Sequence, residues 1–408
     1  MAASDAMTGL SRRWKSLRNL VYPIPVKAVS FPLRLFDKSC YGLLLALPKK
    51  IWVNVIFNNI KYQGADSMKK LSIAFAAAAV TALAFAPQAA EAGTLEEVKA
   101  RGILNCIVNT GLPGFSYTDK SGRWKGFDAD MCRSVAAAVL GDGEKVKFIP
   151  ATGKTRFTLL NSKEGDVIFR NTTWTFVRDV DVKLNYIHTT YYDGQGFIIR
   201  KSKGVKSAKE LDGATICIQT GTTTELNLAD YFRANKISYK PVPIESNEEA
   251  RKNYLADRCD SYTTDASGLA ATRATFDDPD KHVVLPEIIS KEPLGPVVRH
   301  GDDQWADIVR WTVYALIAGE EHGITAANAD KMASSSGNPN VKRLLGSEGN
   351  LGKMIGLDKE WARRAIKAQG NYEEIFERNV GMKTPVGLAR GLNAHYLDGG
   401  LQYSPPFR

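Results

Sequence analysis

The sequence predicts an α/β fold made of two similar lobes. Short apolar runs of strand length alternate with segments of helical periodicity, a pattern typical of β-α-β units. The alternation occurs twice, first before residue 170 and again between residues 214 and 265, and a chain of 408 residues is long enough for two domains. Polar loops follow several strands, at the edge where open α/β sheets hold their ligands.

The first alternation begins with a short helix and contains three strands. Thr94 is expected to cap a helix over residues 94–100, because Glu96 and Glu97 suit its first turn. A longer helix is expected over residues 130–140, where apolar residues recur on one face. The strands are predicted over residues 103–109, 146–149 and 166–169, with a further helix starting at Phe157 and running to Asn161.

The second alternation repeats this order of strands and helices. A loop rich in Gly and Thr, residues 219–224, joins its first strand to its first helix. The strands are predicted over residues 214–218, 239–242 and 260–264, and the helices over residues 225–234 and 247–257.

Two extended segments, residues 191–200 and 283–299, connect the two lobes. A strongly apolar face within residues 302–331 predicts helices that pack back on the first lobe. The chain then crosses between the lobes twice, and two crossings form a hinge. We expect lobe 1 to consist of residues 93–194 and 300–408, including a C-terminal extension, and lobe 2 to consist of residues 195–299.

Residues 68–92 have the three parts of a secretory signal peptide. A basic start at Met68 is followed by an uncharged apolar core over residues 71–86 and a box of small residues that ends at Ala92. A membrane anchor is the alternative, but an anchor needs about 20 apolar residues and this core is shorter. We predict export with cleavage after Ala92, and we interpret residues 1–67 as a non-native N-terminal extension.

The formal net charge of +10 lies mostly outside the expected fold. Residues 1–67 contain ten Lys or Arg and three Asp or Glu, and residues 68–92 contain two Lys and one Glu. The rest of the chain therefore has a formal charge of only +2. A nearly neutral fold does not favour a nucleic-acid partner.

Four of the five cysteines lie in the part that we expect to be exported: Cys106, Cys132, Cys217 and Cys259. An even number of cysteines in an exported chain indicates disulfide bonds, and four cysteines allow three pairings. Pairing Cys106 with Cys132 and Cys217 with Cys259 keeps each bridge within one lobe, so we favour it. Buried free thiols are the alternative, and the spacing does not fit a zinc site.

A polar loop over residues 171–178 follows the third strand of the first alternation. It combines hydroxyls, an amide, an indole and the guanidinium of Arg178. Because a guanidinium binds a carboxylate through two parallel hydrogen bonds, this loop suits a ligand carboxylate. A surface ion pair of Arg178 with Asp179 or Asp181 is the alternative.

Two further features lie in the second alternation. The segment GTTTE over residues 221–225 joins a strand to a helix whose first amides can bind an anion. Helix capping by Thr222 and Glu225 is the alternative, and both interpretations can hold. Asp265 ends a strand among hydroxyl side chains and suits an ammonium group, with capping of the next helix as the alternative. Together the three features complement the two charges of a zwitterion.

These stretches resemble the periplasmic solute-binding proteins of polar amino-acid ABC transporters, in particular the general L-amino-acid-binding type of solute-binding protein family 3. The resemblance covers nearly all of residues 94–408. It implies the type II periplasmic-binding-protein fold, in which two α/β lobes are joined by a two-stranded hinge. The matching stretches are GLPGF at 111–115, GFDAD at 126–130, DV at 166–167, RNTTWT at 170–175, YYDGQGF at 191–197, GTTTEL at 221–226 and TTDAS at 263–267.

The resemblance assigns roles to individual residues. It implies that Arg178 binds the α-carboxylate of the ligand, helped by Thr173 and the amide of Thr223. Asp265 and the carbonyl of Asn171 would bind the α-ammonium group. Phe115 and Trp174 would form the walls of the side-chain pocket, and Thr222 would lie beside the carboxylate. Gln219 and Thr224 would line the rim of the pocket.

The resemblance also implies a function. The protein would capture L-amino acids in the periplasm, close around them and deliver them to an inner-membrane ABC permease. A monomer is expected, with no catalytic residue, metal or cofactor and no nucleic-acid partner. Two alternatives remain: an enzyme similar to periplasmic cyclohexadienyl dehydratases, which needs a general acid in the cleft, and a sensory module that presents its ligand to a receptor.

Overall fold

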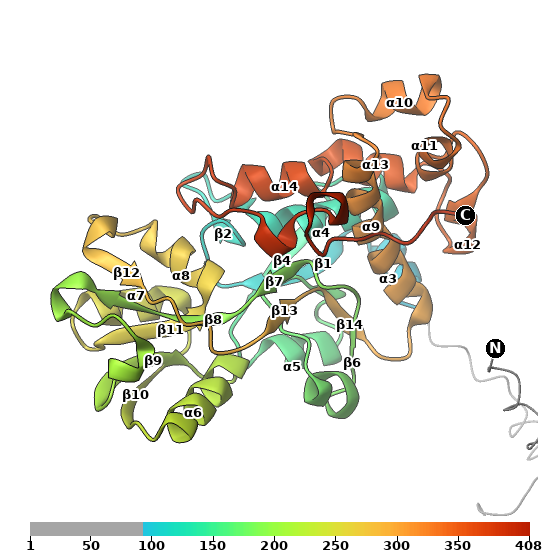
Figure 1. Ribbon diagram of the computed structural model, residues 1–408. Helices are drawn as coiled ribbons and strands as arrows, with labels where there is room; N and C mark the ends of the chain where they lie inside the picture. The colour runs from blue at the N-terminus through green and yellow to red at the C-terminus, as the bar shows by residue number, and fades with distance from the viewer. Residues whose placement is uncertain (1–92) are drawn as a thin grey trace, which may run out of the picture. The chain divides into compact units, whose positions relative to one another are not determined.

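The computed structural model describes residues 93–408, so the expected signal peptide, the preceding segment and Cys40 lie outside the described residues. Two five-stranded sheets, each flanked by helices, form two lobes that lie side by side (Figure 1). The predicted α/β fold of two lobes is confirmed. No helix among residues 93–408 is both long and apolar enough to span a membrane.

The sheet of lobe 1 has the strand order β4-β1-β5-β14-β6. Strands β4, β1 and β5 are parallel, β14 runs antiparallel to them, and β6 is antiparallel to β14 and so has the direction of the first three. Their bounds are β1 (Leu104–Asn109), β4 (Val146–Ala151), β5 (Val167–Ile168), β6 (Leu184–Tyr186) and β14 (Val297–Arg299). The expected end of lobe 2 at residue 299 is therefore wrong, because Val297 pairs with Ile168 and Tyr186 and so belongs to this sheet.

The sheet of lobe 2 has the order β10-β9-β11-β8-β12 and the same pattern, in which only the fourth strand, β8, runs against the others. Its strands are β8 (Gln195–Arg200), β9 (Ala214–Gln219), β10 (Tyr239–Ile244), β11 (Ser261–Asp265) and β12 (His282–Val284). In both lobes the loops that sequence analysis singled out follow the carboxyl ends of the parallel strands β5, β9 and β11.

The two crossings of the chain pair with each other between the sheets. Strand β7 (Tyr191–Asp193) runs antiparallel to β13 (Glu292–Leu294), with Asp193 opposite Glu292. The chain passes from β7 into β8 of lobe 2 and returns through β13 to β14 of lobe 1. This ladder forms the two-stranded connection between the lobes.

The helices pack on the faces of the two sheets. In lobe 1 they are α3 (Thr94–Arg101), α4 (Phe127–Leu140), α5 (Arg156–Asn161) and α9 (Asp303–Glu321), and in lobe 2 they are α6 (Thr223–Asn235), α7 (Asn247–Leu255) and α8 (Ala266–Arg273). Helix α4 begins earlier than expected, because Gly126 at φ 117° lets the chain turn directly into it.

The expected cap of the first helix is wrong. Gly93 occupies the N-cap position of α3, and Thr94 already lies within the helix. The hydroxyl of Thr94 instead accepts a hydrogen bond of 2.8 Å from Arg299 of β14. This contact ties the start of the described chain to the strand that completes the sheet.

Residues beyond α9 extend the core of lobe 1 (Figure 1). They form α10 (Ala329–Ser335), α11 (Pro339–Leu344), α12 (Leu351–Met354), α13 (Trp361–Gln369) and α14 (Tyr372–Asn379). Helix α13 packs on α4 and α9, and Arg364 donates hydrogen bonds to the carbonyls of Ala137 and Ala138 at 3.2 and 3.0 Å. The C-terminal extension is therefore built into lobe 1.

Two disulfide bonds link Cys106 to Cys132 and Cys217 to Cys259, with Cα separations of 6.1 and 5.6 Å. The first ties β1 to α4 in lobe 1, and the second ties β9 to the segment before β11 in lobe 2. The favoured pairing is confirmed.

Candidate ligand-binding site

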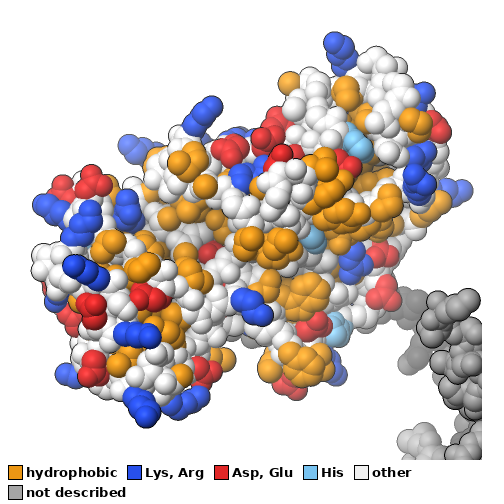
Figure 2. Space-filling model, in the orientation of Figure 1, with side chains coloured by type: hydrophobic (Ala, Val, Ile, Leu, Met, Phe, Trp, Pro, Cys, Tyr) orange, Lys and Arg blue, Asp and Glu red, His pale blue; other side chains and the backbone are white. Residues whose placement is uncertain are grey.

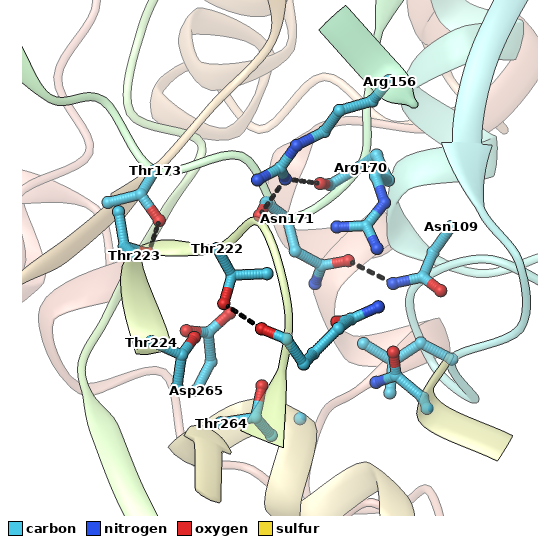
Figure 3. A pocket seen from close by; sticks show the side chains of 14 residues that line it. Asn109, Arg156, Arg170, Asn171, Thr173, Thr222, Thr223, Thr224, Thr264 and Asp265 are labelled. Carbon is cyan, nitrogen blue, oxygen red and sulfur yellow. Dashed lines mark hydrogen bonds between the residues drawn. The ribbon is translucent and has the colours of Figure 1, made fainter. Parts of the chain in front are cut away.

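A polar pocket lies between the lobes, at the carboxyl ends of their parallel strands (Figure 3). Lobe 1 lines it with Asn109, Leu112, Arg156, Arg170, Asn171 and Thr173, and lobe 2 lines it with Gln219, Thr222, Thr223, Thr224, Asn247, Thr264, Asp265 and Gly268. Its free volume of about 20 Å³ has room for little more than one water molecule. The lobes are therefore closed on each other, and a larger ligand needs them to separate.

Direct contacts between the lobes show how tightly they meet. The hydroxyl oxygens of Thr173 and Thr223 are 3.3 Å apart, and Lys154 lies 3.3 Å from Glu245 across the cleft. A Cβ atom on Gly153 would lie only 2.9 Å from the carbonyl oxygen of Thr220. A residue without a side chain is needed there for this degree of closure.

Two arginines of lobe 1, Arg156 and Arg170, form a cationic wall of the pocket that sequence analysis missed. Arg156 Nη1 donates to the carbonyl of Arg170 at 3.3 Å, and Arg170 Nε donates to the carbonyl of Ala151 at 2.9 Å. Arg156 Nε and Arg170 Nη2 are buried and have no partner among the described residues. Burial lowers the pKa of Arg170 to about 10, so its side chain stays charged at neutral pH.

Asn171 lies beside this cationic wall in a left-handed backbone conformation, with φ 39°. Its Oδ1 accepts a hydrogen bond of 3.3 Å from Asn109, whereas its Nδ2 is buried without a partner in the part of the chain that the structure describes. Asn tolerates this conformation better than most residues. In Figure 3 the amide groups of both asparagines lie near Arg170.

Lobe 2 contributes the N-terminus of α6. The hydroxyl of Thr222 accepts a hydrogen bond from the amide of Glu225 at 3.3 Å and donates to the carbonyl of Gln219 at 2.6 Å. The predicted cap is therefore present, and the capping side chain does not use the amides of Thr223 and Thr224. First-turn amides have no partner within a helix and favour an anion, so the capping and anion-binding interpretations are compatible.

Asp265 is the only acidic residue among those that line the pocket. It stands at the N-cap position of α8, but its side chain makes no capping hydrogen bond, so the capping alternative is wrong. Burial raises the pKa of Asp265 well above 3.8, and the nearby carboxylates Asp193 and Glu292 raise it further, while Arg156 and Arg170 oppose the shift. A cation placed against this carboxylate would favour its ionised form.

A second buried carboxylate, Glu292 of β13, holds both threonine hydroxyls. It accepts from Thr173 at 2.5 Å and from Thr223 at 3.0 Å, and also from Asn227 at 2.6 Å and Ser290 at 2.7 Å. Because each hydroxyl has one proton, both threonines face other groups only with oxygen lone pairs. The hydroxyl of Thr173 therefore presents an acceptor rather than the expected donor for a carboxylate.

Two expected wall residues do not line the pocket. Phe115 is 1% exposed and packs edge-on against Phe127 and Tyr191 in the core, so Leu112 is the residue of this turn that reaches the pocket. Trp174 stacks on Tyr186 with ring centres 5.5 Å apart, and its indole nitrogen donates to Asp179 at 2.7 Å. Both side chains are held away from the pocket by better local partners.

Arg178 lies next to the pocket but not in its lining. It is 8% exposed, and its Nη1 donates to the carbonyl of Thr173 at 2.9 Å. It makes no ion pair within residues 93–408, so the alternative of a surface pair with Asp179 or Asp181 is wrong. Seven of the ten expected site residues line one pocket: Asn171, Thr173, Gln219, Thr222, Thr223, Thr224 and Asp265.

Two α/β lobes on a two-stranded connection, with a closed polar pocket between them, define the class of two-lobed proteins that bind small solutes. Residues 104–325 match the family of bacterial extracellular solute-binding proteins, family 3, and the chain belongs to this family. Its fold is that of the type II periplasmic binding proteins.

Three relatives cover most of the chain. It is 59% identical to the glutamate/glutamine/aspartate/asparagine-binding protein BztA of Rhodobacter capsulatus, over 84% of this chain and 100% of that protein. It is 57% identical to the general L-amino acid-binding periplasmic protein AapJ of Rhizobium johnstonii, over 83% and 99% respectively. A solved structure from Brucella ovis, a periplasmic binding protein with glutathione bound, is 56% identical and has a TM-score of 0.76, over 78% of this chain and 100% of that one.

Proposed function

We propose that the protein captures L-amino acids outside the cytoplasmic membrane and delivers them to an ABC permease. Membership of solute-binding protein family 3 supports this proposal, as do the relatives named for binding amino acids. Export with cleavage after Ala92 is part of the proposal. Mass spectrometry of the secreted protein tests it, with Gly93 as the expected first residue.

One observation carries the proposal. The pocket sets unpartnered donors of lobe 1 and the free amides of α6 against the single carboxylate of Asp265. A zwitterion brings an anion for the first set and a cation for the second. Burying either charge without a partner is costly, so both ends of the ligand are required for tight binding.

The roles of the residues follow from these groups. Arg178 and the amides at the start of α6 bind the α-carboxylate, once the contact between Thr173 and Thr223 has opened. Asp265 binds the α-ammonium group, and the lone pairs of the two threonine hydroxyls accept its remaining hydrogens. Closure of the lobes then removes the bound groups from water.

The charge balance of the pocket favours particular side chains. Arg156 and Arg170 bring two positive charges against the one negative charge of Asp265. A ligand whose side chain ends in a carboxylate or an amide oxygen supplies acceptors for their free nitrogens. Glutamate, aspartate and their amides are therefore the preferred ligands, and these are the four amino acids in the name of the Rhodobacter relative.

The free α-amino-acid end defines the ligand class more closely than its size does. Glutathione, bound in the Brucella structure, keeps this end because its glutamyl residue is linked through the side chain. Conjugates of this kind therefore belong to the proposed ligand class.

A thermal-shift panel tests the function. A ligand that binds only the native state raises the melting temperature of the purified protein. We expect shifts with several L-amino acids, largest for the acidic ones and their amides, and none with their decarboxylated analogues. Prephenate tests the dehydratase alternative: a shift or turnover with prephenate and silence from every amino acid would contradict the proposal.

A further inference from the structure

A second hollow of about 400 Å³ lies between the lobes and is distinct from the pocket described above. Its lining is mostly polar and comes from both lobes. Lobe 1 supplies Thr110, Gly111, Pro113, Tyr117 and Thr118, and lobe 2 supplies Asn247, Glu248, Arg251, Thr272 and Thr275.

The two hollows adjoin along three shared walls. Asn247 lines both of them. In the turn after β1, Leu112 lines the first pocket, and the adjacent residues Gly111 and Pro113 line the second hollow. Helix α8 does the same, since Gly268 lines the pocket and Thr272, one turn further on, lines the hollow together with Thr275 just after the helix.

Asn247, at the boundary, has an acceptor without a partner. Its side chain is 6% exposed, and its Oδ1 is buried with no hydrogen bond to any described residue. Native structures rarely leave such an atom unpaired, so an unpaired one indicates a missing partner. A donor that passes between the two hollows, such as the N–H of an amide, would satisfy it.

Arg251 of α7 gives the hollow a positive charge that has no hydrogen-bonded partner among the described residues. The other charged lining residue, Glu248, is paired with Lys252 at 2.7 Å. Arg251 is half-buried and makes no hydrogen bond or ion pair within the described part of the chain. A guanidinium in this state suits a carboxylate.

We propose that this hollow is a second subsite, which binds an amide-linked extension of the ligand side chain. This inference rests on the proposed function, because the first pocket holds the α-amino-acid end. The ligand class is a γ-glutamyl compound: its amide N–H meets Asn247 Oδ1, and its terminal carboxylate meets Arg251. An α-linked dipeptide does not fit, because its peptide bond consumes the carboxylate that the first pocket binds.

Isothermal titration of the purified full-length protein tests the subsite with two isomers, γ-glutamylglycine and α-glutamylglycine, and with L-glutamate. We expect the γ isomer and glutamate to bind and the α isomer to fail. In Arg251→Ala, affinity for the γ isomer falls about tenfold or more, because a charge-assisted hydrogen bond is lost. Affinity for glutamate stays within about twofold, as expected for a change outside its site.

Two further variants complete the design. Thr275→Trp fills the exposed side of the hollow and should block the γ isomer while leaving glutamate binding intact. Arg258→Ala removes a nearby exposed arginine that does not line the hollow, and it should change neither affinity. Equal loss of both ligands in Arg251→Ala, or no binding of the γ isomer while glutamate binds, overturns the subsite alone. Failure of glutamate itself to bind overturns the proposed function as well.

Discussion

The two lobes have the same strand arrangement but contribute opposite chemistry to the pocket. Lobe 1 presents the guanidinium groups of Arg156 and Arg170, and lobe 2 presents the carboxylate of Asp265 together with the amides that begin α6. Among the residues that line the pocket, lobe 1 has no carboxylate, so the ammonium group of the ligand finds its charge partner only in lobe 2. The proposed ligand therefore gains its full set of partners only when the lobes meet, which makes closure depend on the ligand.

The lobes also differ in how their cores are built. Lobe 1 has one large apolar cluster that includes the C-terminal helices and a smaller one that contains Ile107 and Ile168. Lobe 2 has two smaller clusters that contain residues from β8 and β9, such as Ile199 and Ile216 in one and Ile198 and Cys217 in the other. Lobe 1 therefore has the larger apolar core, to which the C-terminal helices contribute.

On the face that Figure 2 shows, basic and acidic side chains of the described residues are intermingled over lobe 2.

The largest expected effect on ligand affinity comes from removing the carboxylate that lobe 2 contributes, that of Asp265. Asp265→Asn leaves the ammonium group of the ligand buried without a charge partner, so affinity should fall about a hundredfold or more. Isothermal titration with L-glutamine measures this loss. Asp230→Asn, an exposed change on α6, serves as the control and should bind normally. Unchanged affinity in Asp265→Asn would contradict the claim that lobe 2 binds the ammonium group of the ligand.

The arginines of lobe 1 have two proposed roles: Arg178 binds the α-carboxylate of every ligand, and Arg170 binds the side chain of acidic ligands. Alanine variants separate these roles. Arg178→Ala should abolish binding of every amino acid without unfolding the protein. Arg170→Ala should lower affinity for glutamate about tenfold, because a charge-assisted bond is lost, and affect alanine much less. Titrations with both ligands, alongside circular dichroism, give the comparison. Equal losses for glutamate and alanine in Arg170→Ala would contradict its role in side-chain recognition.

Closure itself is tested at Gly153. A valine there would place a Cβ 2.9 Å from both the carbonyl of Thr220 and the side chain of Thr222. The lobes could then no longer meet, so the ligand should dissociate faster while its association rate changes little. Stopped-flow kinetics with L-glutamate measures both rates. The same dissociation rate as in the unmodified protein would show that this contact does not limit closure.

The pH dependence separates ligand affinity from stability. Burial raises the pKa of Asp265 above 3.8, and the ammonium group needs its ionised form, so affinity for L-glutamine should fall as the pH drops through the raised pKa. The unliganded protein should behave in the opposite way. Since the unfolded chain ionises first, the contribution of Asp265 to the free energy of unfolding is lost as the pH rises through the folded pKa.

Titrations between neutral and acidic pH, with denaturant unfolding at the same pH values, check these two trends. Asp265→Asn removes the titrating group, so its residual affinity should not vary with pH. A wild-type affinity that stays flat over this range would contradict the shifted pKa.

The smallest effect on binding is expected from the disulfide of lobe 2. Its partners, Cys217 and Cys259, are 42 residues apart, and loss of such a bridge typically destabilises a protein by about 2–5 kcal/mol. The double variant Cys217→Ser, Cys259→Ser should therefore melt at a lower temperature yet keep its affinity below that temperature. Differential scanning calorimetry and titration measure both. A large loss of affinity at a temperature where the variant is folded would mean that the bridge also positions the site.

The sequence predicts the parts of this fold that depend on local patterns. Strand runs, the cap at Thr222 and the order of the lobes follow from periodicity and turn chemistry, and the structure has them. The assignment of Val297 to the wrong lobe has a different cause. A short apolar strand has the same pattern in either sheet, and only its long-range pairing with Ile168 decides.

The errors in the site have the same physical origin. Phe115 and Leu112 belong to one turn, and no pattern tells which of them reaches the pocket and which enters the core. Arg156 begins helix α5, outside the strand-end loops that were singled out, and its burial beside Arg170 arises from the packing of that helix. Arg170 adjoins Asn171 at a strand end, and this position was the one local signal that could have identified it.

The central claim is that Arg178 of lobe 1 and the first amides of α6 bind the α-carboxylate of the ligand, while Asp265 of lobe 2 binds its ammonium group. Isothermal titration of L-glutamate, glutarate and 4-aminobutanoate tests it most directly, because glutarate lacks the ammonium group and 4-aminobutanoate lacks the α-carboxylate. The account predicts tight binding of glutamate and a loss of about a hundredfold or more for each analogue. Comparable binding of glutamate and either analogue would contradict it.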